Sequence, residues 1–237
     1  MKTGNPNPIY PPELLVEICP HYYELHDQLM LEIKKHFRKA SKKPLRILEI
    51  GCGSGYTTTC LLISFPDASI VSIDRDEKAI RQAKIATEQL GEHVQVSFVH
   101  DDALLYLQNS DRPKFDVITS ALTFHNFTKD YRKKIHAILR KNLRTGGVFA
   151  NADKYYLGNR ATHLAKLNWQ ISQIMDVFAS KADFDGNHDW VMHYLNDELP
   201  QFRMPWSTTK KELSGNGATK ITRKFSEKME TILLATF

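Results

Sequence analysis

The chain has 237 residues, 42% of them apolar and 25% charged, which is enough to build a large α/β domain around a sizeable core. No apolar run approaches the ~18 residues that a membrane-spanning helix needs, and residues 1–15 lack the apolar centre of a secretory signal. Three cysteines without C-x-x-C spacing argue against a disulfide framework and a cysteine-based zinc site, and favour a reducing, cytoplasmic setting. The formal net charge of +5 leaves an acidic partner open, because basic residues gather in the ranges 34–46 and 129–144.

The N-terminal segment divides at its prolines. Residues 1–12 carry four of them and are expected to form a loose arm. Pro20 stands where the first turn of a helix tolerates proline, and Pro44 closes the segment. Between them, apolar residues recur at helical spacing, at Tyr22, Leu25, Leu29, Ile33 and Phe37.

Short β-branched runs alternate with helical ones from Leu45 onward. One helix is expected to begin at the cap residue Asp76 and to stop at Gly91, and another to begin at Thr128 and end before Gly146. Five strands separated by helices predict right-handed βαβ units and a parallel sheet covered on both faces. The strand candidates are residues 45–50, 69–73, 94–99, 115–119 and 147–151.

The alternation stops after the fifth strand. Helical patterns over residues 160–182 and 189–199 belong to an insertion that spans residues 155–206. Two strand-like runs follow at residues 219–225 and 229–237, too close together for a helical crossover, so we expect them to pair antiparallel at a sheet edge. The whole pattern predicts an α/β fold with a doubly wound, seven-stranded sheet, mostly parallel, with an antiparallel C-terminal hairpin and a helical insertion.

The first strand ends in the sequence L-E-I-G-C-G-S-G, the strongest functional signal in the chain. Glycine at positions 51, 53 and 55 lets the backbone turn sharply and approach a ligand that side chains would exclude. Tyr56 stands where the dinucleotide fingerprint G-x-G-x-x-G needs its third glycine, and no Gly-Lys-Ser/Thr follows as in a P-loop. The loop therefore indicates a different ligand site, with a plain tight turn as the alternative.

Polar residues follow the next three strands. Asp74 ends the second strand, where a carboxylate can accept hydrogen bonds from both hydroxyls of a ribose; its alternative role is a helix cap, which Asp76 fills better. Asp101 and Asp102 end the third strand and suit an adenine amino group or, equally, an N-cap. The fourth strand ends in the run from Ser120 to His125, at the edge where open α/β sheets bind ligands.

Together these motifs resemble a class I S-adenosylmethionine (SAM) dependent methyltransferase, firmly over residues 20–155. The resemblance implies a Rossmann-like fold and SAM as cofactor, with the methionine part near the glycine loop, the ribose on Asp74 and the adenine on Asp102. The SAM-binding residues that it implies are Glu49, Gly51, Cys52, Gly53, Gly55, Asp74, Arg75, Asp101, Asp102, Ala103 and Ser120.

The resemblance also implies a division of labour along the chain. Residues 1–43 are expected to cover the cofactor site, residues 44–154 to form the SAM-binding core, residues 155–206 to cap the substrate, and residues 207–237 to complete the sheet.

A narrower likeness concerns the start of the first helix. Cys19-Pro20-His21-Tyr22 is similar to the corresponding segment of carboxy-SAM synthases, which serve wobble-uridine modification of tRNA, and this makes Tyr22 a further cofactor candidate. The glycine loop departs from that branch, and no arginine can be assigned to the extra carboxylate. Ordinary SAM chemistry is therefore favoured.

His125 is the candidate catalytic residue, because it lies just beyond the fourth strand, where the methyl acceptor should sit. It could take a proton, hydrogen-bond the substrate or simply pack. No metal site is expected: His188 and His193 are five apart, on different sides of a helix, and residues 183–187 lack the spacing of a calcium loop.

The insertion is the expected acceptor-binding element. Its residues 181–198 carry five carboxylates against one lysine, among many aromatic residues, which suits an amine-bearing small molecule better than an RNA backbone. A tRNA-modifying enzyme and a non-catalytic nucleotide-binding protein are the alternatives, and a second copy of the chain stays open as a partner. The five carboxylates are Asp183, Asp185, Asp189, Asp197 and Glu198.

Overall fold

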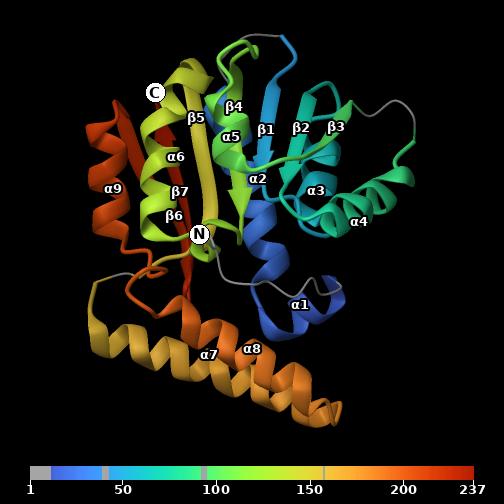
Figure 1. Cartoon of the computed structure of the whole chain (residues 1–237), viewed down its shortest axis with the longest axis vertical. Coiled ribbons are helices and arrows are strands. Elements are labelled where there is room, and N and C mark those ends of the chain that lie inside the picture. Colours follow the sequence, from blue (N-terminus) through green and yellow to red (C-terminus); the bar gives the residue numbers. More distant parts are fainter. Residues whose placement is uncertain (1–11, 39–42, 92–94, 157) are drawn as a thin grey trace.

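The computed structural model describes residues 12–38, 43–91, 95–156 and 158–237, and within them seven strands form one sheet in the order β3-β2-β1-β4-β5-β7-β6 (Figure 1). The first five strands are parallel, and β7 pairs antiparallel with both β5 and β6. The predicted fold is thereby confirmed, whereas the expected arm lies outside the described residues except for Pro12. The strands are β1 (Arg46–Ile50), β2 (Ser69–Asp74), β3 (Val96–His100), β4 (Phe115–Ala121), β5 (Leu143–Lys154), β6 (Lys220–Glu227) and β7 (Glu230–Thr236).

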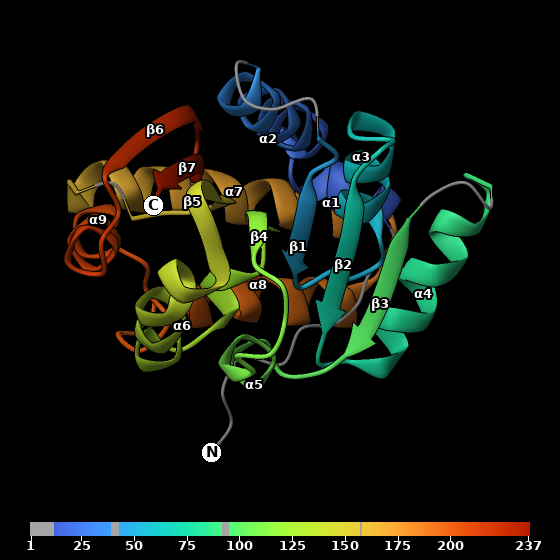
Figure 2. The same ribbon diagram turned by 90° about the horizontal axis from the view of Figure 1, so that it is seen from above.

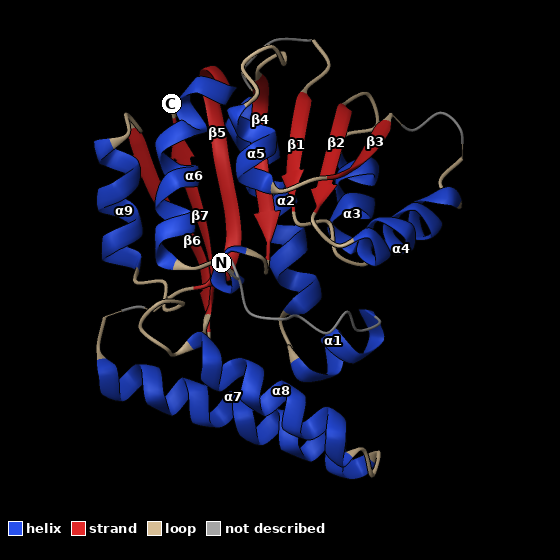
Figure 3. Ribbon diagram, in the orientation of Figure 1, coloured by secondary structure: helices blue, strands red, loops and turns tan. Residues whose placement is uncertain are grey.

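Helices cover both faces of the sheet, as the buried strands require (Figures 2 and 3). On one face, α2 (Tyr22–Phe37) and α3 (Tyr56–Ser64) pack on the strands, and α4 (Glu77–Glu88) lies beside α3. On the other face lie α5 (Ala103–Gln108), α6 (Lys129–Asn142) and α9 (Trp206–Gly215). Each strand therefore supplies alternate side chains to two apolar cores.

The caps explain where two of the predicted helices begin. The side chain of Asp76 accepts a hydrogen bond from the backbone N of Lys78 at 2.8 Å, and Thr128 caps α6 through the backbone N of Tyr131. The helix that starts after Asp76 ends at Glu88, before the expected stop at Gly91.

The insertion forms an antiparallel pair of helices, α7 (Arg160–Ser180) and α8 (Phe184–Asp197). The pair crosses the end of the sheet at which the parallel strands finish, next to α1 (Pro12–Ile18) (Figure 1). A small apolar core, which includes Ile18, Ile174 and Trp190, joins these three helices. The second helix starts earlier than expected because the Asp183 side chain caps it, accepting from the backbone N of Gly186 at 2.9 Å.

The register of the central strands places their carboxyl ends side by side. Ile50 of β1 pairs with Ile73 of β2, and the backbone N–H groups of Gly51 and Cys52 both donate to the carbonyl oxygen of Ile73. The glycine loop, the end of β2 and the end of β4 therefore meet at the point where the strand order reverses. None of the helices in the described ranges has the length and hydropathy to cross a bilayer.

Candidate functional site

A cavity of about 450 Å³ opens at this edge, between the strand ends and the helices α1, α2 and α8. Its volume lies in the ~300–1,000 Å³ range of small-molecule sites. Ten of the thirteen residues expected at the site line it: Tyr22, Gly51, Cys52, Gly53, Asp74, Arg75, Asp101, Asp102, Ala103 and His125. The exceptions among the described residues are Glu49, Gly55 and Ser120.

The glycine loop shows why the backbone is bare where it faces the cavity. Gly51 has φ +79°, and a Cβ there would lie 2.4 Å from the Thr123 side chain. At Gly53, with φ +51°, a Cβ would meet no protein atom within 4 Å. Gly51 is thus required by the packing of the loop, whereas Gly53 leaves room for a ligand. Gly55 starts α3, and a Cβ there would press on Ala83, so its role is to seat the helix.

Glu49 and Ser120 lie beneath the loop and outside the lining of the cavity. Glu49 is fully buried, and its Oε2 accepts from the hydroxyls of Thr58 and Ser72, both at 2.6 Å. Burial raises the pKa of Glu49 to about 7, despite the opposing effect of the two hydrogen bonds. The Ser120 hydroxyl donates to the carbonyl oxygen of Ile50 at 2.8 Å. Both residues fix the ends of β1 and β4 from inside.

The carboxylate of Asp74 faces the cavity and also holds the loop. Its Oδ2 accepts from the backbone N of Gly53 and its Oδ1 from that of Asp76, each at 3.0 Å. Burial raises its pKa. Because each carboxylate oxygen has two lone pairs, both oxygens keep an acceptor position for a ligand.

Asp102 caps α5 and also lines the cavity, so its capping role does not remove it from the candidate site. Its Oδ1 caps α5 by accepting from the backbone N of Leu104 and Leu105, and it accepts from the Tyr131 hydroxyl at 2.8 Å. Asp102 and Tyr131 both line the cavity. Tyr131 was not expected at the site, because its helical spacing marked it as a core residue.

Aromatic rings from α2 and α3 lie together in the wall of the cavity. The rings of Tyr22 and Tyr56 lie 5.0 Å apart and those of His26 and Tyr56 4.8 Å apart, measured between centroids. Tyr22 is only 5% exposed yet lines the cavity, which agrees with its place as a cofactor candidate.

His125 lies at the other end of the cavity, in the short helix η1 (Phe124–Asn126). Its Nδ1 donates to Oδ1 of Asp153 at 2.6 Å. Asp153 is fully buried, and its Oδ2 accepts from the backbone N of Phe124 and His125 at 2.8 and 3.3 Å. The carboxylate thereby fixes both the orientation of the imidazole and its tautomer, leaving Nε2 as the nitrogen with a lone pair.

The wall beside His125 comes from β5 and α8. Lys154, Trp190, His193 and Tyr194 line the cavity there. The Lys154 ammonium lies 2.5 Å from Oδ2 of Asp197 and 3.9 Å from the centre of the Tyr194 ring. Burial and the lysine charge lower the pKa of His193 to about 3. Lys154 could have been found by extending the fifth strand beyond residue 151.

The carboxylates of the expected acidic cap do not line the cavity. Asp183, Asp185 and Asp189 are exposed and lie outside the lining of the cavity. Asp197 pairs with Lys154, and Oε1 of Glu198 accepts a hydrogen bond from His163 Nε2 at 2.7 Å. The carboxylates that the sequence places together are therefore either in solvent or already paired.

The reversed strand order, the glycine loop and the carboxylate at the end of β2 define a Rossmann-like nucleotide-binding domain. A family of methyltransferase domains matches residues 41–214, and the chain belongs to this family. The enzyme class expected from the sequence is thereby confirmed. The narrower likeness to carboxy-SAM synthases gains no support from this match.

Similar proteins share the domain but differ in what they act on. The chain is 29% identical over 100 residues to ribosomal RNA small subunit methyltransferase G of Staphylococcus haemolyticus, covering 42% of this chain and 38% of that protein. It is 32% identical over 100 residues to malonyl-acyl-carrier-protein O-methyltransferase 1 of Ilyobacter polytropus, covering 39% and 35%. The chain thus spans little more than a third of the length of these relatives.

A solved structure extends the likeness of the fold. Magnesium protoporphyrin IX methyltransferase of Synechocystis, which contains bound SAM, superposes with a TM-score of 0.60 over 98% of this chain and 86% of its own, at 14% identity. SAM is therefore the cofactor that the family and its structural neighbours indicate.

Proposed function

We propose that this protein transfers the methyl group of SAM to a small-molecule acceptor that His125 contacts. The observation that carries the proposal is the continuity of the cavity: the glycine loop and acidic strand ends share it with the His125–Asp153 pair. A cofactor site and a positioned imidazole in one cavity are what a methyl transfer needs.

The residues present fit SAM. The bare backbone at Gly53 gives room for the methionine part, and the acceptor positions that remain on Asp74 suit the two ribose hydroxyls. Asp102, at the end of the next strand, suits the adenine amino group. The residues that would hold the cofactor run from the end of β3 to the end of β1, and His125 follows the neighbouring strand β4.

Methyl transfer from a sulfonium is an in-line displacement in which positive charge disperses. Such a reaction needs positioning more than charge stabilisation, and well-oriented reactants gain up to ~7–11 kcal/mol. The protein's part is to hold the acceptor atom in line and to exclude water. Nε2 of His125 can accept the proton that a hydroxyl, thiol or ammonium group loses, and the imidazolium that forms is stabilised by Asp153.

The shape of the acceptor end favours a small molecule. Trp190 and Tyr194 are 7% and 4% exposed and line this end of the cavity, and such a buried aromatic wall suits a small molecule better than an RNA strand. The argument for an amine-bearing acceptor loses its main support, since the carboxylates that suggested it do not line the cavity. The proposal therefore covers acceptors with an ionisable hydroxyl, thiol or amine.

A methyl-transfer assay tests this. Labelled SAM is incubated with the protein and, in parallel, with a metabolite library and a total tRNA pool, after calorimetry with SAM and S-adenosylhomocysteine. We expect binding of both ligands and label in a small molecule. Label in tRNA alone would replace the small-molecule acceptor by RNA, and binding without transfer to either pool would leave a nucleotide-binding protein. Tight binding of NAD with no binding of SAM would overturn the proposal.

A further inference from the structure

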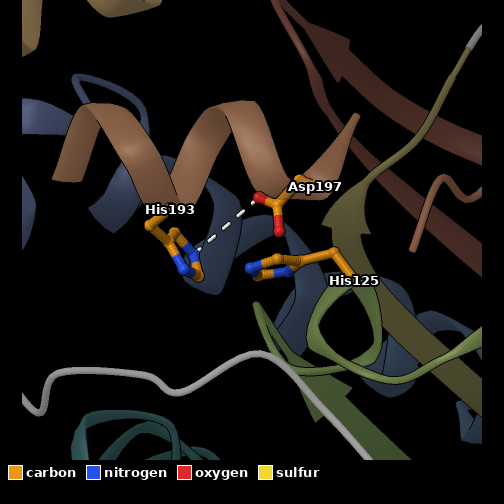
Figure 4. Close-up of side chains that lie close together, drawn as sticks. All are labelled: His125, His193 and Asp197. Carbon is orange, nitrogen blue, oxygen red and sulfur yellow. Dashed lines mark ion pairs between the residues drawn. The ribbon is translucent and has the colours of Figure 1, made fainter. Parts of the chain in front are cut away.

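Two histidines and an aspartate gather at the acceptor end of the cavity (Figure 4). His193 and Asp197 are four residues apart on α8 and so lie on one face of the helix, with His193 Nε2 3.8 Å from Oδ2 of Asp197. His125 faces them from η1, and its ring centroid lies 5.8 Å from that of His193. The two helices thus bring three ligand-type side chains together from distant parts of the chain.

The cluster is buried and compact. His125 and His193 are each 5% exposed and Asp197 is 7% exposed, and one ligand atom from each lies within 4.8 Å of the other two. Zinc–nitrogen and zinc–oxygen bonds are ~2.0–2.2 Å long, so an ion would draw these atoms together by small side-chain rotations.

One atom in the cluster lacks a protein partner. Within the described residues, Oδ1 of Asp197 is buried and has no hydrogen-bond partner, although Oδ2 holds Lys154. In Figure 4 the dashed ion pair uses Oδ2, and the second carboxylate oxygen points into the space between the two imidazoles. A buried carboxylate oxygen left unpaired destabilises the folded state, so a ligand at this point would remove that penalty.

The carboxylate of Asp153, outside the cluster, orients the imidazole of His125. Oδ1 of Asp153 accepts the Nδ1 proton of His125, which leaves the lone pair of Nε2 available. Metal-binding histidines usually donate their other nitrogen to a carboxylate in this way, because the contact orients the ring and makes it more basic.

From these observations we infer that His125, His193 and Asp197 bind a first-row divalent transition ion, with Nε2 of His125 and Oδ1 of Asp197 as two of the ligand atoms. Two imidazoles and one carboxylate are a donor set for zinc or ferrous iron with positions left open. The ligand set includes two residues that line the cavity, so an open position would face the acceptor.

This inference deepens the proposed function, because it names the acceptor's chemistry. A bound ion supplies a Lewis acid that lowers the pKa of a coordinated hydroxyl or water. Since the ion and a proton would use the same nitrogen of His125, the imidazole would then act as a ligand and not as the base. The acceptor would be an oxygen compound able to coordinate an ion, such as a phenol, an enol or a hydroxy acid.

The ion pair between Lys154 and Asp197 offers a competing explanation for the cluster. Its ammonium already neutralises Asp197, so the cluster without an ion is a buried ion pair beside two histidines. The two explanations predict opposite effects of the lysine charge. An ion is repelled by Lys154 and binds more tightly once the charge is removed, whereas a simple ion pair gives no ion binding with or without it.

The test is metal binding by the full chain. Protein stripped with a chelator is titrated with Zn²⁺ by calorimetry, its metal content is measured after dialysis, and Co²⁺ is added separately to record the absorption spectrum of the cluster. Each titration is repeated for His193→Ala, Asp197→Asn and Lys154→Met. His188→Ala and Asp189→Asn are the matched controls, because both residues are exposed on the same helix. SAM binding by every variant is measured in parallel.

We expect one tightly held ion per chain, a loss of affinity of at least about tenfold in His193→Ala and Asp197→Asn, no change in the controls, and equal or tighter binding in Lys154→Met. Failure of the wild type to bind Zn²⁺, or binding that the cluster variants leave unchanged, would overturn the inference. The Co²⁺ spectrum of the wild type decides the matter even if a variant does not fold. If the protein binds SAM normally but binds no ion, the metal site is refuted and the proposed function still stands.

Discussion

Oδ2 of Asp74 accepts a hydrogen bond from the backbone N of Gly53 at 3.0 Å, so the end of β2 and the glycine loop form one unit. The carboxylate proposed to bind the ribose therefore also fixes the backbone of the loop proposed to hold the methionine part. A change at Asp74 should thus affect both cofactor affinity and loop geometry.

Replacing Asp74 should weaken SAM binding more than it weakens the fold. Asp74→Ala removes charge-assisted hydrogen bonds worth ~1.5–3 kcal/mol each, so the dissociation constant of SAM should rise at least about tenfold. Calorimetry with SAM measures it, with Asp67→Ala, an exposed loop position, as the control. An unchanged constant with an intact fold would make Asp74 a structural residue only.

Alanine substitutions at two loop glycines should have different effects, one on folding and the other on SAM binding. A Cβ at Gly51 would lie 2.4 Å from Thr123, so Gly51→Ala should destabilise the protein. Gly53→Ala meets no protein atom, and its positive φ costs only ~1–2 kcal/mol, so the protein should fold yet bind SAM poorly. Thermal unfolding and calorimetry of the two variants test this contrast, and tight SAM binding by folded Gly53→Ala would contradict it.

His125 should affect the reaction and not the binding of SAM. With His125→Gln we expect a fall in the transfer rate of at least about 10²-fold at a nearly unchanged SAM dissociation constant, because the acceptor loses either its base or a ligand of the ion inferred beside it. His188→Gln, an exposed change on α8, should leave both values alone. A rate unaffected by His125→Gln would remove this residue from the reaction.

Much of this arrangement could be predicted from the sequence, because it depends on local patterns. The β-branched runs, the caps at Asp76 and Thr128 and the glycine loop each act over a few residues, and the sheet follows from them. The positions of Glu49 and Ser120 depend on which face of a strand turns inward, and the resemblance to a family does not specify that face. Both are buried beneath the loop.

The acceptor end could not be predicted in the same way. Sequence proximity grouped the acidic residues of the insertion, but the fold of α7 and α8 turns Asp183 and Asp189 to solvent. The spacing of four between His193 and Asp197 was the available signal, and it became informative only when the chain brought His125 opposite them.

Glu49 predicts an unusual pH dependence of stability. Its pKa is raised to about 7 by burial, above the ordinary value of 4.5, so the folded state binds its proton more tightly than the unfolded state does. The free energy of unfolding should therefore decrease as pH rises between 4.5 and 7, by up to ~3 kcal/mol from this group. Urea unfolding at pH 5 and pH 8 measures it.

Glu49→Gln is the matched variant, because it cannot ionise. The difference in unfolding free energy between wild type and Glu49→Gln should shift against the wild type from pH 5 to pH 8. His26, whose pKa burial lowers to about 4, acts in the opposite sense in both proteins and cancels in this difference. A difference that stays constant with pH would show that Glu49 does not titrate in this range.

The outer carboxylates of the insertion and its inner aromatic wall should behave differently toward the acceptor. Asp183, Asp185 and Asp189 are exposed and outside the cavity, so replacing all three by Asn should change neither the KM for the acceptor nor the SAM dissociation constant. Asparagine caps a helix about as well as aspartate, so α8 should persist. Trp190→Ala, in contrast, opens the wall of the cavity and should raise KM several-fold while SAM binding stays the same, because contacts to the acceptor are lost. Steady-state kinetics on the acceptor found by the transfer assay distinguishes the two changes. If the triple variant raises KM and Trp190→Ala does not, the acceptor binds on the outer face of α8, and the enclosed site proposed beside His125 is wrong.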